Sequence, residues 1–350
     1  MHPTQIVVLA FGVAAIVGTL LLLLPISTAA GNNTTLVTAF FTAVSAVCIT
    51  GLTVVDTATH WSGFGQFVIM ILIQLGGLGI VSFATLLGLL ISGRISLKDR
   101  MNTLSEAKIV GADNVPKLLG RILLVYFGFE VVLATYLTLR LHLSYGQELL
   151  SSIWHGTFHA ISAFNNGGFS LYTDSMVGFN QDMFFIAPVM LAVIVGGLGF
   201  PVLIELHERL WRLRLRPGGK AKRFSLHTRL TLWMTGTLLI LGALFIGAME
   251  WNNPGTLGAL NTWDKLVNTM FASVMPRSGG LNSVDISQMD PATWLGIDLL
   301  MFIGGGSAST AGGIKVTTIA VLIFIIYTEI RGETAVNVGN RRLPRSIQRQ

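Results

Sequence analysis

Charged residues are scarce in this sequence. Asp, Glu, Lys and Arg make up 11% of the 350 residues, whereas soluble domains usually carry about 25%. Cysteine is nearly absent too, and because Cys48 is the only one, an internal disulfide is excluded. No Ser/His/Asp or Cys/His arrangement suggests nucleophilic catalysis, so we do not expect an enzyme. Hydrophobic residues, by contrast, are abundant. They make up 52% of the sequence, which favours a membrane protein.

Apolar runs of roughly 20 residues, long enough to cross a bilayer as helices, recur along the chain. They cover residues 6–24, 64–91, 118–139, 184–204 and 230–248. A sixth run, 294–327, is too long for one unbroken span. The first run could instead be a signal peptide with small residues at 27–30 as a cleavage site. A membrane helix is favoured, because residues 1–5 carry no Lys or Arg and the run exceeds the usual h-region length.

The positive charges are segregated along the chain. Of the 23 Lys and Arg residues, 19 fall in three segments, 92–121, 207–229 and 328–350. The positive-inside rule makes these segments cytoplasmic. We therefore expect a multi-pass protein of the cell (inner) membrane whose N-terminus and basic loops face the cytoplasm. The segment 207–229 would contact anionic membrane lipid, and nucleic acid is not an expected partner because this loop is short and has no binding motif.

Two long apolar runs separate consecutive cytoplasmic segments, which divides the chain into repeated units. We expect three helix–pore-loop–helix repeats, 1–110, 111–225 and 226–350, the last with a glycine-rich broken second helix. Each unit contains a shorter apolar stretch that ends in a glycine followed by a bulky apolar residue. These glycines, Gly51, Gly168 and Gly280, are 117 and 112 residues apart, a regularity typical of internal repeats.

The three short stretches are too short to span, which favours a re-entrant pore helix followed by an extended loop. Unpaired backbone is tolerated at membrane depth only where it lines water or is buried in protein. A ring of backbone carbonyls can replace the hydration shell of potassium, and glycine permits the backbone angles that this needs. The alternative interpretation is a set of extracellular hairpins in which the glycines only turn the chain.

Glycines also mark the second long run of each unit. Pairs at 76–77, 196–197 and 304–305 begin 25, 28 and 24 residues after the three anchoring glycines, and the first two pairs predict close helix packing. Segment 304–313 holds five glycines with Ser and Thr inside an apolar run. It should break the helix and form a flexible gate beneath the pore, with tight packing as the alternative. It is not a phosphate-binding P-loop, because Lys315 follows Ile314 and no Ser or Thr comes next.

The three glycine-anchored loops, the Gly-Gly-Leu-Gly helices and above all the segment 304–315 resemble the Trk/Ktr/HKT superfamily of potassium transporters, and within it the KtrB type. The resemblance implies an all-α multi-pass membrane protein with four helix–pore-loop–helix units around a pseudo-fourfold pore. Three of the expected four are present. We therefore expect the chain to be a fragment that lacks about 100 residues, and its 350 residues alone would not close the ring.

The resemblance also implies roles for particular residues. The potassium-binding filter positions would be Ile49, Thr50, Gly51, Asn166, Gly167, Gly168, Ser278, Gly279 and Gly280. The residues flanking the filter would be Cys48, Asn165 and Arg277. The gate would comprise Gly304, Gly305, Gly306, Ser307, Ser309, Thr310, Gly312, Gly313 and Lys315. Potassium would be the substrate and the only metal, held at the filter, with no covalently bound cofactor.

The resemblance implies channel-like potassium uptake as the function, with sodium as an activator. The family implies a homodimer and a cytoplasmic ring of nucleotide-binding (RCK-type) regulatory subunits. Two other functions remain open. A secondary cation symporter with alternating access predicts inverted repeats, whereas these units run in the same orientation, and a non-conducting membrane scaffold needs no filter.

Three other kinds of ionisable residue stand out. His155 and His159 are four residues apart in the second expected pore helix, where packing is favoured over a metal site because the Glu of a zinc-protease motif is lacking. Glu130 lies within an apolar run, where an unpaired charge is costly, so we expect it to have a buried hydrogen-bonding partner. Lys315 at membrane depth would repel cations when the gate is closed, or extend its amine to the interface.

Overall fold

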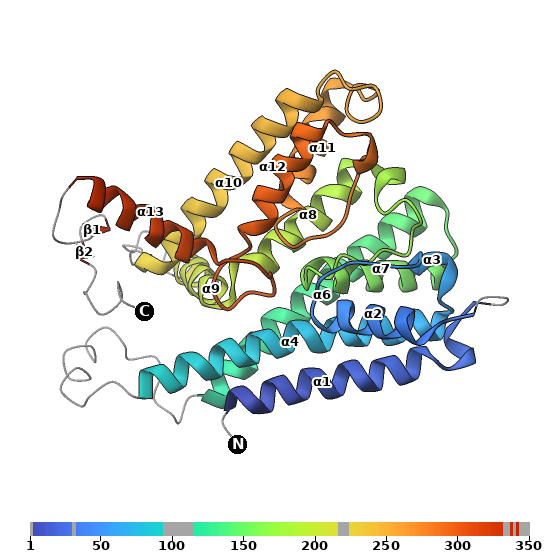
Figure 1. The fold of residues 1–350 in the computed structure, drawn as a ribbon, viewed down its shortest axis with the longest axis horizontal. Coiled ribbons are helices and arrows are strands. Elements are labelled where there is room, and N and C mark those ends of the chain that lie inside the picture. Colours follow the sequence, from blue (N-terminus) through green and yellow to red (C-terminus); the bar gives the residue numbers. More distant parts are fainter. Residues whose placement is uncertain are drawn as a thin grey trace.

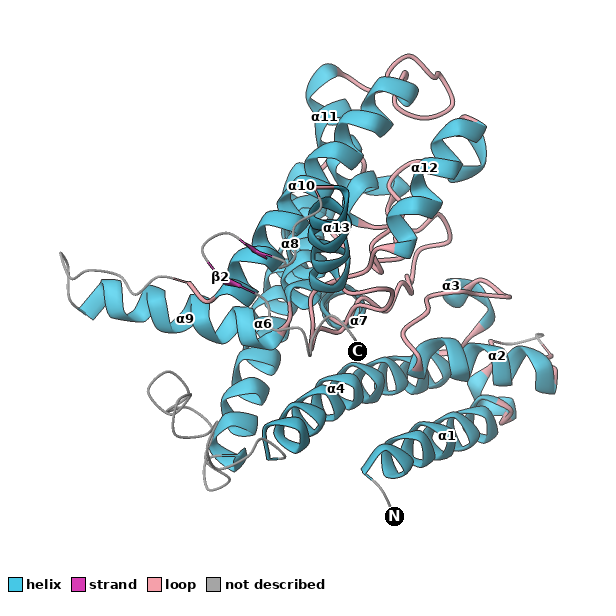
Figure 2. Cartoon of the chain, turned by 60° about the vertical axis from the view of Figure 1, so that its left-hand side comes forward, coloured by secondary structure: helices cyan, strands magenta, loops and turns pink. Residues whose placement is uncertain are grey.

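The structure is a computed structural model that describes residues 3–29, 33–93, 115–215, 224–331, 337–338 and 341–342. The regular secondary structure of the described part is helical apart from one short antiparallel pair, β1 (Asn337–Val338) with β2 (Arg341–Arg342), and loops join the helices (Figure 2). The expected all-α class is therefore confirmed. Large parts of the three basic segments, 92–121, 207–229 and 328–350, lie outside the described residues.

The first unit consists of two long helices around a short one. Its elements are α1 (Pro3–Leu22), η1 (Pro25–Ser27), α2 (Leu36–Val47), α3 (Thr57–His60) and α4 (Gly63–Gly93). Helix α2 begins at Thr35, whose hydroxyl accepts the N–H of Thr38 at 3.2 Å and caps the helix. With 12 residues, α2 is about 18 Å long and cannot cross a hydrocarbon core of about 30 Å. Helices α1 and α4 pack side by side and α2 packs against both (Figure 1).

The second unit repeats this arrangement with a bend in its last helix. Its elements are α6 (Val115–Tyr145), α7 (Leu149–Phe164), η3 (Val177–Phe179), α8 (Met183–Leu198) and α9 (Phe200–Leu215). The run 184–204, which the sequence presents as continuous, changes direction by 106° between α8 and α9. Gly199 at the bend has a φ of 93°, a conformation that glycine adopts readily and other residues do not.

The third unit contains the broken apolar run. Its elements are α10 (Leu226–Glu250), α11 (Thr262–Val274), η4 (Ile286–Gln288), α12 (Pro291–Phe302) and α13 (Val316–Ile330). Residues 303–315 between α12 and α13 are not helical, and we call them the glycine-rich segment. Helix α10 packs against α11, α12 and α13. In Figure 1 this unit lies at the top and α1 with α4 at the bottom.

The short helices α2, α7 and α11 are held by the longer helices around them. Helix α7 contacts α4, α6 and α8, and α11 contacts α8 as well as α10, so each of these two also touches a neighbouring unit. The largest buried apolar cluster joins α6, α7, α8 and α11, and a second joins the first unit to Phe158 and Phe169 of the second. The units therefore share one interior.

By length and composition, the described helices include two that could each cross a membrane, Ile122–Tyr145 and Leu226–Glu250. The bent pair α8 and α9 would make a third. Large apolar side chains are exposed on these helices, for example Val132, Leu143 and Trp233 at 71–75%. Apolar exposure on this scale is expected where lipid is the solvent.

Candidate functional site

Each expected pore loop follows the C-terminus of a short apolar helix. We define the first loop as residues 48–51, the second as 165–168 and the third as 277–280. In every loop, a residue with positive φ stands two positions before a glycine with positive φ. The pairs are Ile49 (55°) with Gly51 (74°), Asn166 (58°) with Gly168 (73°), and Ser278 (87°) with Gly280 (70°). Since non-glycine residues seldom adopt such angles, the three loops share an unusual backbone conformation.

The helix ends hold this conformation by returning hydrogen bonds. In the first loop the N–H of Thr50 bonds to the carbonyl of Ser45 at 2.9 Å, and in the second the N–H of Gly167 bonds to that of Ser162 at 2.6 Å. Both bonds reach back five residues, as in a Schellman-type helix end. In the third loop, the carbonyl of Met275 accepts both the N–H of Gly279 at 2.7 Å, four residues on, and the N–H of Gly280 at 3.1 Å, five residues on. The third loop therefore leaves its helix by a slightly different turn.

The three loops meet at their anchoring glycines. A methyl group built on Gly168 would lie 2.9 Å from the Cα atom of Gly51 and 3.2 Å from that of Gly280. A methyl group on Gly280 would lie 2.7 Å from the Cα atom of Gly168. Such contacts leave no room for a side chain. Glycine is thus required at this meeting point both for its φ angle and for the close approach of three backbones.

The residues beside the loops differ in their surroundings. Cys48 is a free, exposed cysteine, whereas Asn165 is fully buried. Arg277 is buried and donates from Nη2 to the carbonyl oxygen of Gly304 at 3.1 Å. Gly304 belongs to the glycine-rich segment, so this hydrogen bond joins that segment to the third loop.

The glycine-rich segment is a closed loop whose two arms lie against each other. The N–H of Gly304 bonds to the carbonyl of Ile314 at 3.0 Å, and the N–H of Val316 bonds to that of Gly305 at 3.0 Å. A methyl group on Gly304 would lie 1.7 Å from the carbonyl oxygen of Gly312. Gly313 has a φ of 73° at the return of the loop. Glycine is again what permits the close approach.

Side chains join the glycine-rich segment to the second and third loops. Nδ2 of Asn166 donates to the hydroxyl of Thr310 at 3.2 Å, and that hydroxyl contacts the carbonyl of Phe164, the last residue of α7, at 3.3 Å. The N–H of Gly312 donates to Oγ of Ser278 at 3.1 Å. The segment therefore contacts two of the three loops directly.

The remaining candidate gate residues brace the segment internally or against α8. The N–H of Gly306 bonds to the carbonyl of Gly197 at 2.7 Å. Ser309 donates to the carbonyl of Gly306 at 2.7 Å, and the hydroxyl of Ser307 lies 3.0 Å from that of Thr317. The amine of Lys315 donates to the carbonyl of Ala311 at 2.6 Å. Lys315 thus closes its own loop in this structure.

The histidines of α7 are engaged in packing. Nδ1 of His159 lies 2.7 Å from the carbonyl of His155, and its Nε2 accepts the N–H of Leu171 at 3.2 Å. Both rings pack against Tyr172. Among the described residues, no group of three or more His, Cys, Asp or Glu could hold a metal ion.

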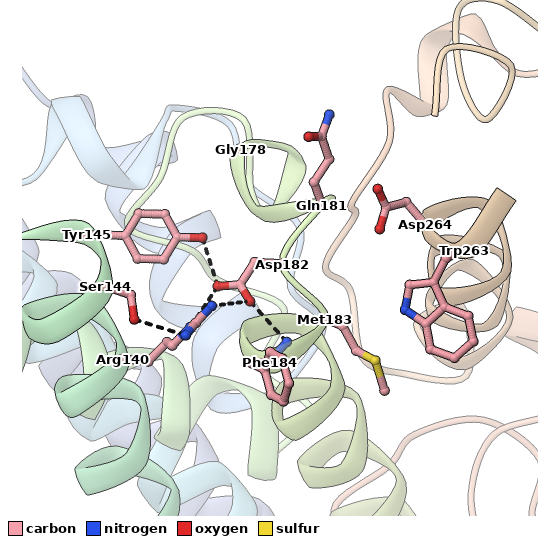
Figure 3. A pocket seen from close by; sticks show the side chains of 10 residues that line it. All are labelled: Arg140, Ser144, Tyr145, Gly178, Gln181, Asp182, Met183, Phe184, Trp263 and Asp264. Atoms are coloured by element: carbon pink, nitrogen blue, oxygen red, sulfur yellow. Dashed lines mark hydrogen bonds and ion pairs between the residues drawn. The ribbon is translucent and has the colours of Figure 1, made fainter. Parts of the chain in front are cut away.

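A cavity of about 700 Å³ lies apart from the loops, since no candidate filter residue lines it (Figure 3). In it, Arg140 and Asp182 form a two-pronged ion pair with N–O distances of 2.9 and 3.0 Å. Burial raises the pKa of Asp182, but hydrogen bonds from Arg140 and Tyr145 lower it by more, so that its pKa lies below the ordinary value. Asp182 also caps α8 by accepting the N–H of Phe184 at 3.0 Å. The ion pair therefore anchors α8 to α6.

Two residues that sequence reasoning did not single out lie behind the second loop. Gln74 of α4 accepts a hydrogen bond from Nδ2 of Asn165 at 3.2 Å, and the hydroxyl of Tyr126 of α6 donates to Oδ1 of Asn165. The sequence pointed to this cluster through Glu130, an acid in an apolar run, and through Asn165 beside the second loop, but not to their contact, because the partners of Glu130 are 35 and 56 residues away in sequence.

These features define a helical protein with helices long and apolar enough to cross a membrane, in which three helix-end loops meet at one point. The sequence matches the TrkH family, described as cation transport proteins, over residues 1–350, and the chain belongs to this family.

Curated relatives and a solved structure resemble the chain over most of its length. It is 40% identical to the Ktr system potassium uptake protein B of Bacillus subtilis, over 97% of this chain and 74% of the relative. It is 35% identical to the potassium/sodium uptake protein NtpJ of Enterococcus hirae, over 98% of this chain and 73% of that protein. The crystal structure of the potassium transporter TrkH from Vibrio parahaemolyticus has the same fold, with a TM-score of 0.72 at 18% identity. The match covers 98% of this chain and 66% of the TrkH chain.

Proposed function

We propose that the chain takes up potassium as the channel-like translocating subunit of a Ktr/Trk-type system, and that the backbone carbonyls of the three loops hold the dehydrated ion. Potassium uptake by such a membrane subunit is the activity that the family and the relatives support. Since these relatives are transporters, the prediction that the chain is not an enzyme is confirmed.

The observation that carries the filter proposal is the repeated backbone geometry at the three glycines. Three separate loops adopt the same pair of positive φ angles and approach one another through Gly51, Gly168 and Gly280. The helices α2, α7 and α11 end at these loops, so the partially negative ends of their dipoles lie beside the proposed ion positions. Carbonyl oxygens held in this way can replace the hydration shell of a monovalent cation.

The gate proposal depends on the contacts of the glycine-rich segment. The segment interrupts an apolar run and contacts Asn166 and Ser278 of two loops. A non-helical stretch in this position can close the path of the ion when it lies against the loops, and can open it by moving away. Its five glycines make such a movement sterically possible.

The assembly is proposed from the family alone. We expect a multi-pass protein of the inner membrane, with its N-terminus and basic loops in the cytoplasm, that forms a homodimer on a cytoplasmic ring of nucleotide-binding (RCK-type) subunits. Sodium is proposed as an activator from the family resemblance, and one relative is named a potassium/sodium uptake protein.

The filter proposal is tested by rubidium uptake in a bacterial strain that lacks its own potassium uptake systems. Gly168→Ala forces a methyl group to within 2.9 Å of a backbone atom at a φ of 73°. The left-handed backbone costs about 1–2 kcal/mol and overpacking about 1–3 kcal/mol. We therefore expect uptake to fall by at least tenfold. Gly236→Ala is the matched control, because nothing lies within 4 Å of a methyl group built there. Unchanged uptake by the Gly168 variant at equal membrane abundance would contradict the proposal.

A further inference from the structure

A cluster of polar side chains lies buried behind the second loop. It consists of Gln74 from α4, Tyr126 and Glu130 from α6, and Asn165 at the end of α7. Tyr126 and Asn165 are fully buried, Glu130 is 5% exposed and Gln74 is half-buried. The cluster thus joins three helices from two units at the point where the second loop begins.

The hydrogen bonds of the cluster converge on Asn165. Its Nδ2 donates to Oε1 of Glu130 at 2.9 Å and contacts Oε1 of Gln74 at 3.2 Å. Nε2 of Gln74 donates to Oε2 of Glu130 at 2.8 Å. The hydroxyl of Tyr126 donates to Oδ1 of Asn165. Both ends of the Asn165 amide are therefore held, and its orientation is fixed by the chemistry of its partners.

A carboxyl group in this place needs a specific reason. An acid buried within a membrane helix is costly unless it is well paired. Within the described ranges, the hydrogen bonds of Glu130 come from Gln74 and Asn165, and no cationic side chain pairs with it. Its partners there are neutral amides. What it offers over an apolar or an amide side chain is two acceptor oxygens, which hold Gln74 and Asn165 at the same time.

The chain makes room for this arrangement. A methyl group on Gly77 of α4 would lie 1.8 Å from Oδ1 of Asn165 and 2.6 Å from the hydroxyl of Tyr126. Only glycine lets α4 approach the end of α7 so closely. The first loop begins at the exposed Cys48 and has no comparable buried anchor at that position. The second loop is therefore held in a way that the first is not.

We propose that Glu130 is a positioning residue for ion selection: it fixes Asn165, and through Asn165 it sets the backbone of Asn166, Gly167 and Gly168. This inference rests on the proposed function of the second loop as part of a filter. Asn165 directly precedes Asn166, which holds a φ of 58°. A loop that keeps this backbone keeps its carbonyls at the spacing suited to a dehydrated potassium ion, and a loosened loop discriminates less well against sodium.

The test compares Glu130→Gln with an exchange of two residues. In Glu130→Gln, one oxygen becomes an NH₂ group that faces an amide donor of Gln74 or Asn165. We expect KM for rubidium to rise by roughly 2- to 10-fold, the equivalent of one hydrogen bond, and the rubidium-to-sodium uptake ratio to fall. The double variant Gln74→Glu with Glu130→Gln again places one carboxyl and one amide between the same helices. We therefore expect KM for rubidium and the rubidium-to-sodium uptake ratio to return to within about twofold of wild type.

Two further variants keep the test decisive. Glu250→Gln alters another fully buried carboxyl held by neutral donors, in the third unit; it should lower thermal stability without changing the ion ratio. Tyr126→Phe removes only the hydroxyl that donates to Asn165, and it decides the matter if Glu130→Gln does not reach the membrane. A wild-type ion ratio in Glu130→Gln or in Tyr126→Phe, or no recovery in the exchange, overturns the inference. If instead Gly168→Ala transports normally, the filter itself is in error.

Discussion

Removal of the Ser278 hydroxyl should weaken the hold of the third loop on the glycine-rich segment. In the structure this oxygen accepts the N–H of Gly312 at 3.1 Å. A hydrogen bond of this kind contributes about 0.5–1.5 kcal/mol net. Gly312 is exposed, so water can replace the lost partner, and the lower part of that range applies. A change of about 0.5–1 kcal/mol shifts the ratio of open to closed segment by roughly 2- to 5-fold.

The assay is the initial rate of rubidium entry into liposomes that contain the purified protein without regulatory subunits. We expect Ser278→Ala to raise this rate by roughly 2- to 5-fold. KM should stay the same, because the loop keeps its carbonyl groups. Ser287→Ala is the control, since that hydroxyl bonds to Asp285 on an exposed turn, and its rate should equal that of wild type.

A second substitution separates the hydrogen bond from backbone strain. Ser278 has a φ of 87°, and Ser278→Gly removes the same hydroxyl while also relieving about 1 kcal/mol of strain. If the hydrogen bond holds the segment, the Ala and Gly variants gain rate equally. A wild-type rate for Ser278→Ala, or a gain in Ser278→Gly alone, would refute the reasoning.

Three other changes should have distinct effects. Arg277→Met removes the donor to the Gly304 carbonyl, and we expect rubidium flux without regulatory subunits to rise, with Arg277→Lys between it and wild type. Gly199→Ala places a methyl group 2.3 Å from a carbonyl of the glycine-rich segment at a φ of 93°, and should lower the melting temperature in detergent by several degrees, an effect of about 2–4 kcal/mol. The lowered pKa of Asp182 means that its pairing with Arg140 stabilises the fold above the unfolded-state pKa and is lost as pH falls through the folded-state value. Asp182→Asn should therefore lower the melting temperature at neutral pH, with a difference from wild type that shrinks in acid.

The helical class and the family could be read from the sequence because they depend on local signals. The length of the apolar runs, the segregation of the positive charges and the spacing of Gly51, Gly168 and Gly280 can each be recognised without knowledge of the fold. The bend at Gly199 was not predicted, although Gly199 and Pro201 are residues that often mark a helix end. The angle of the bend and the contact with the glycine-rich segment involve residues far away in the sequence.

The partners of Glu130 were equally hidden from the sequence. An acid in an apolar run indicates that a buried partner exists, but it does not say which residue provides it. The hydrogen bonds come from Gln74 and Asn165, on two other helices. The positive φ angle of Ile49 was equally hidden, because a β-branched residue disfavours that conformation and the surrounding structure must enforce it.

The glycine pairs of the three units show how one sequence feature serves two structural purposes. A methyl group on Gly76 would lie 2.2 Å from the carbonyl of Val47, the last residue of α2, and one on Gly196 would lie 1.9 Å from that of Phe164, the last residue of α7. In the first two units, glycine therefore lets α4 and α8 pack closely against the C-terminal ends of α2 and α7, respectively.

In the third unit the corresponding glycines contact other partners. A methyl group on Gly305 would lie 2.4 Å from the carbonyl of Gly197 in α8, and the N–H of Gly306 bonds to that same carbonyl. The chain thus leaves the helical path and crosses to the neighbouring unit. Because Gly197 stands beside Gly196, which seats the end of α7, the glycine-rich segment docks where the second loop is supported. A displacement of the segment must therefore disturb the support of the second loop, so gating and ion selection should be coupled through the end of α7.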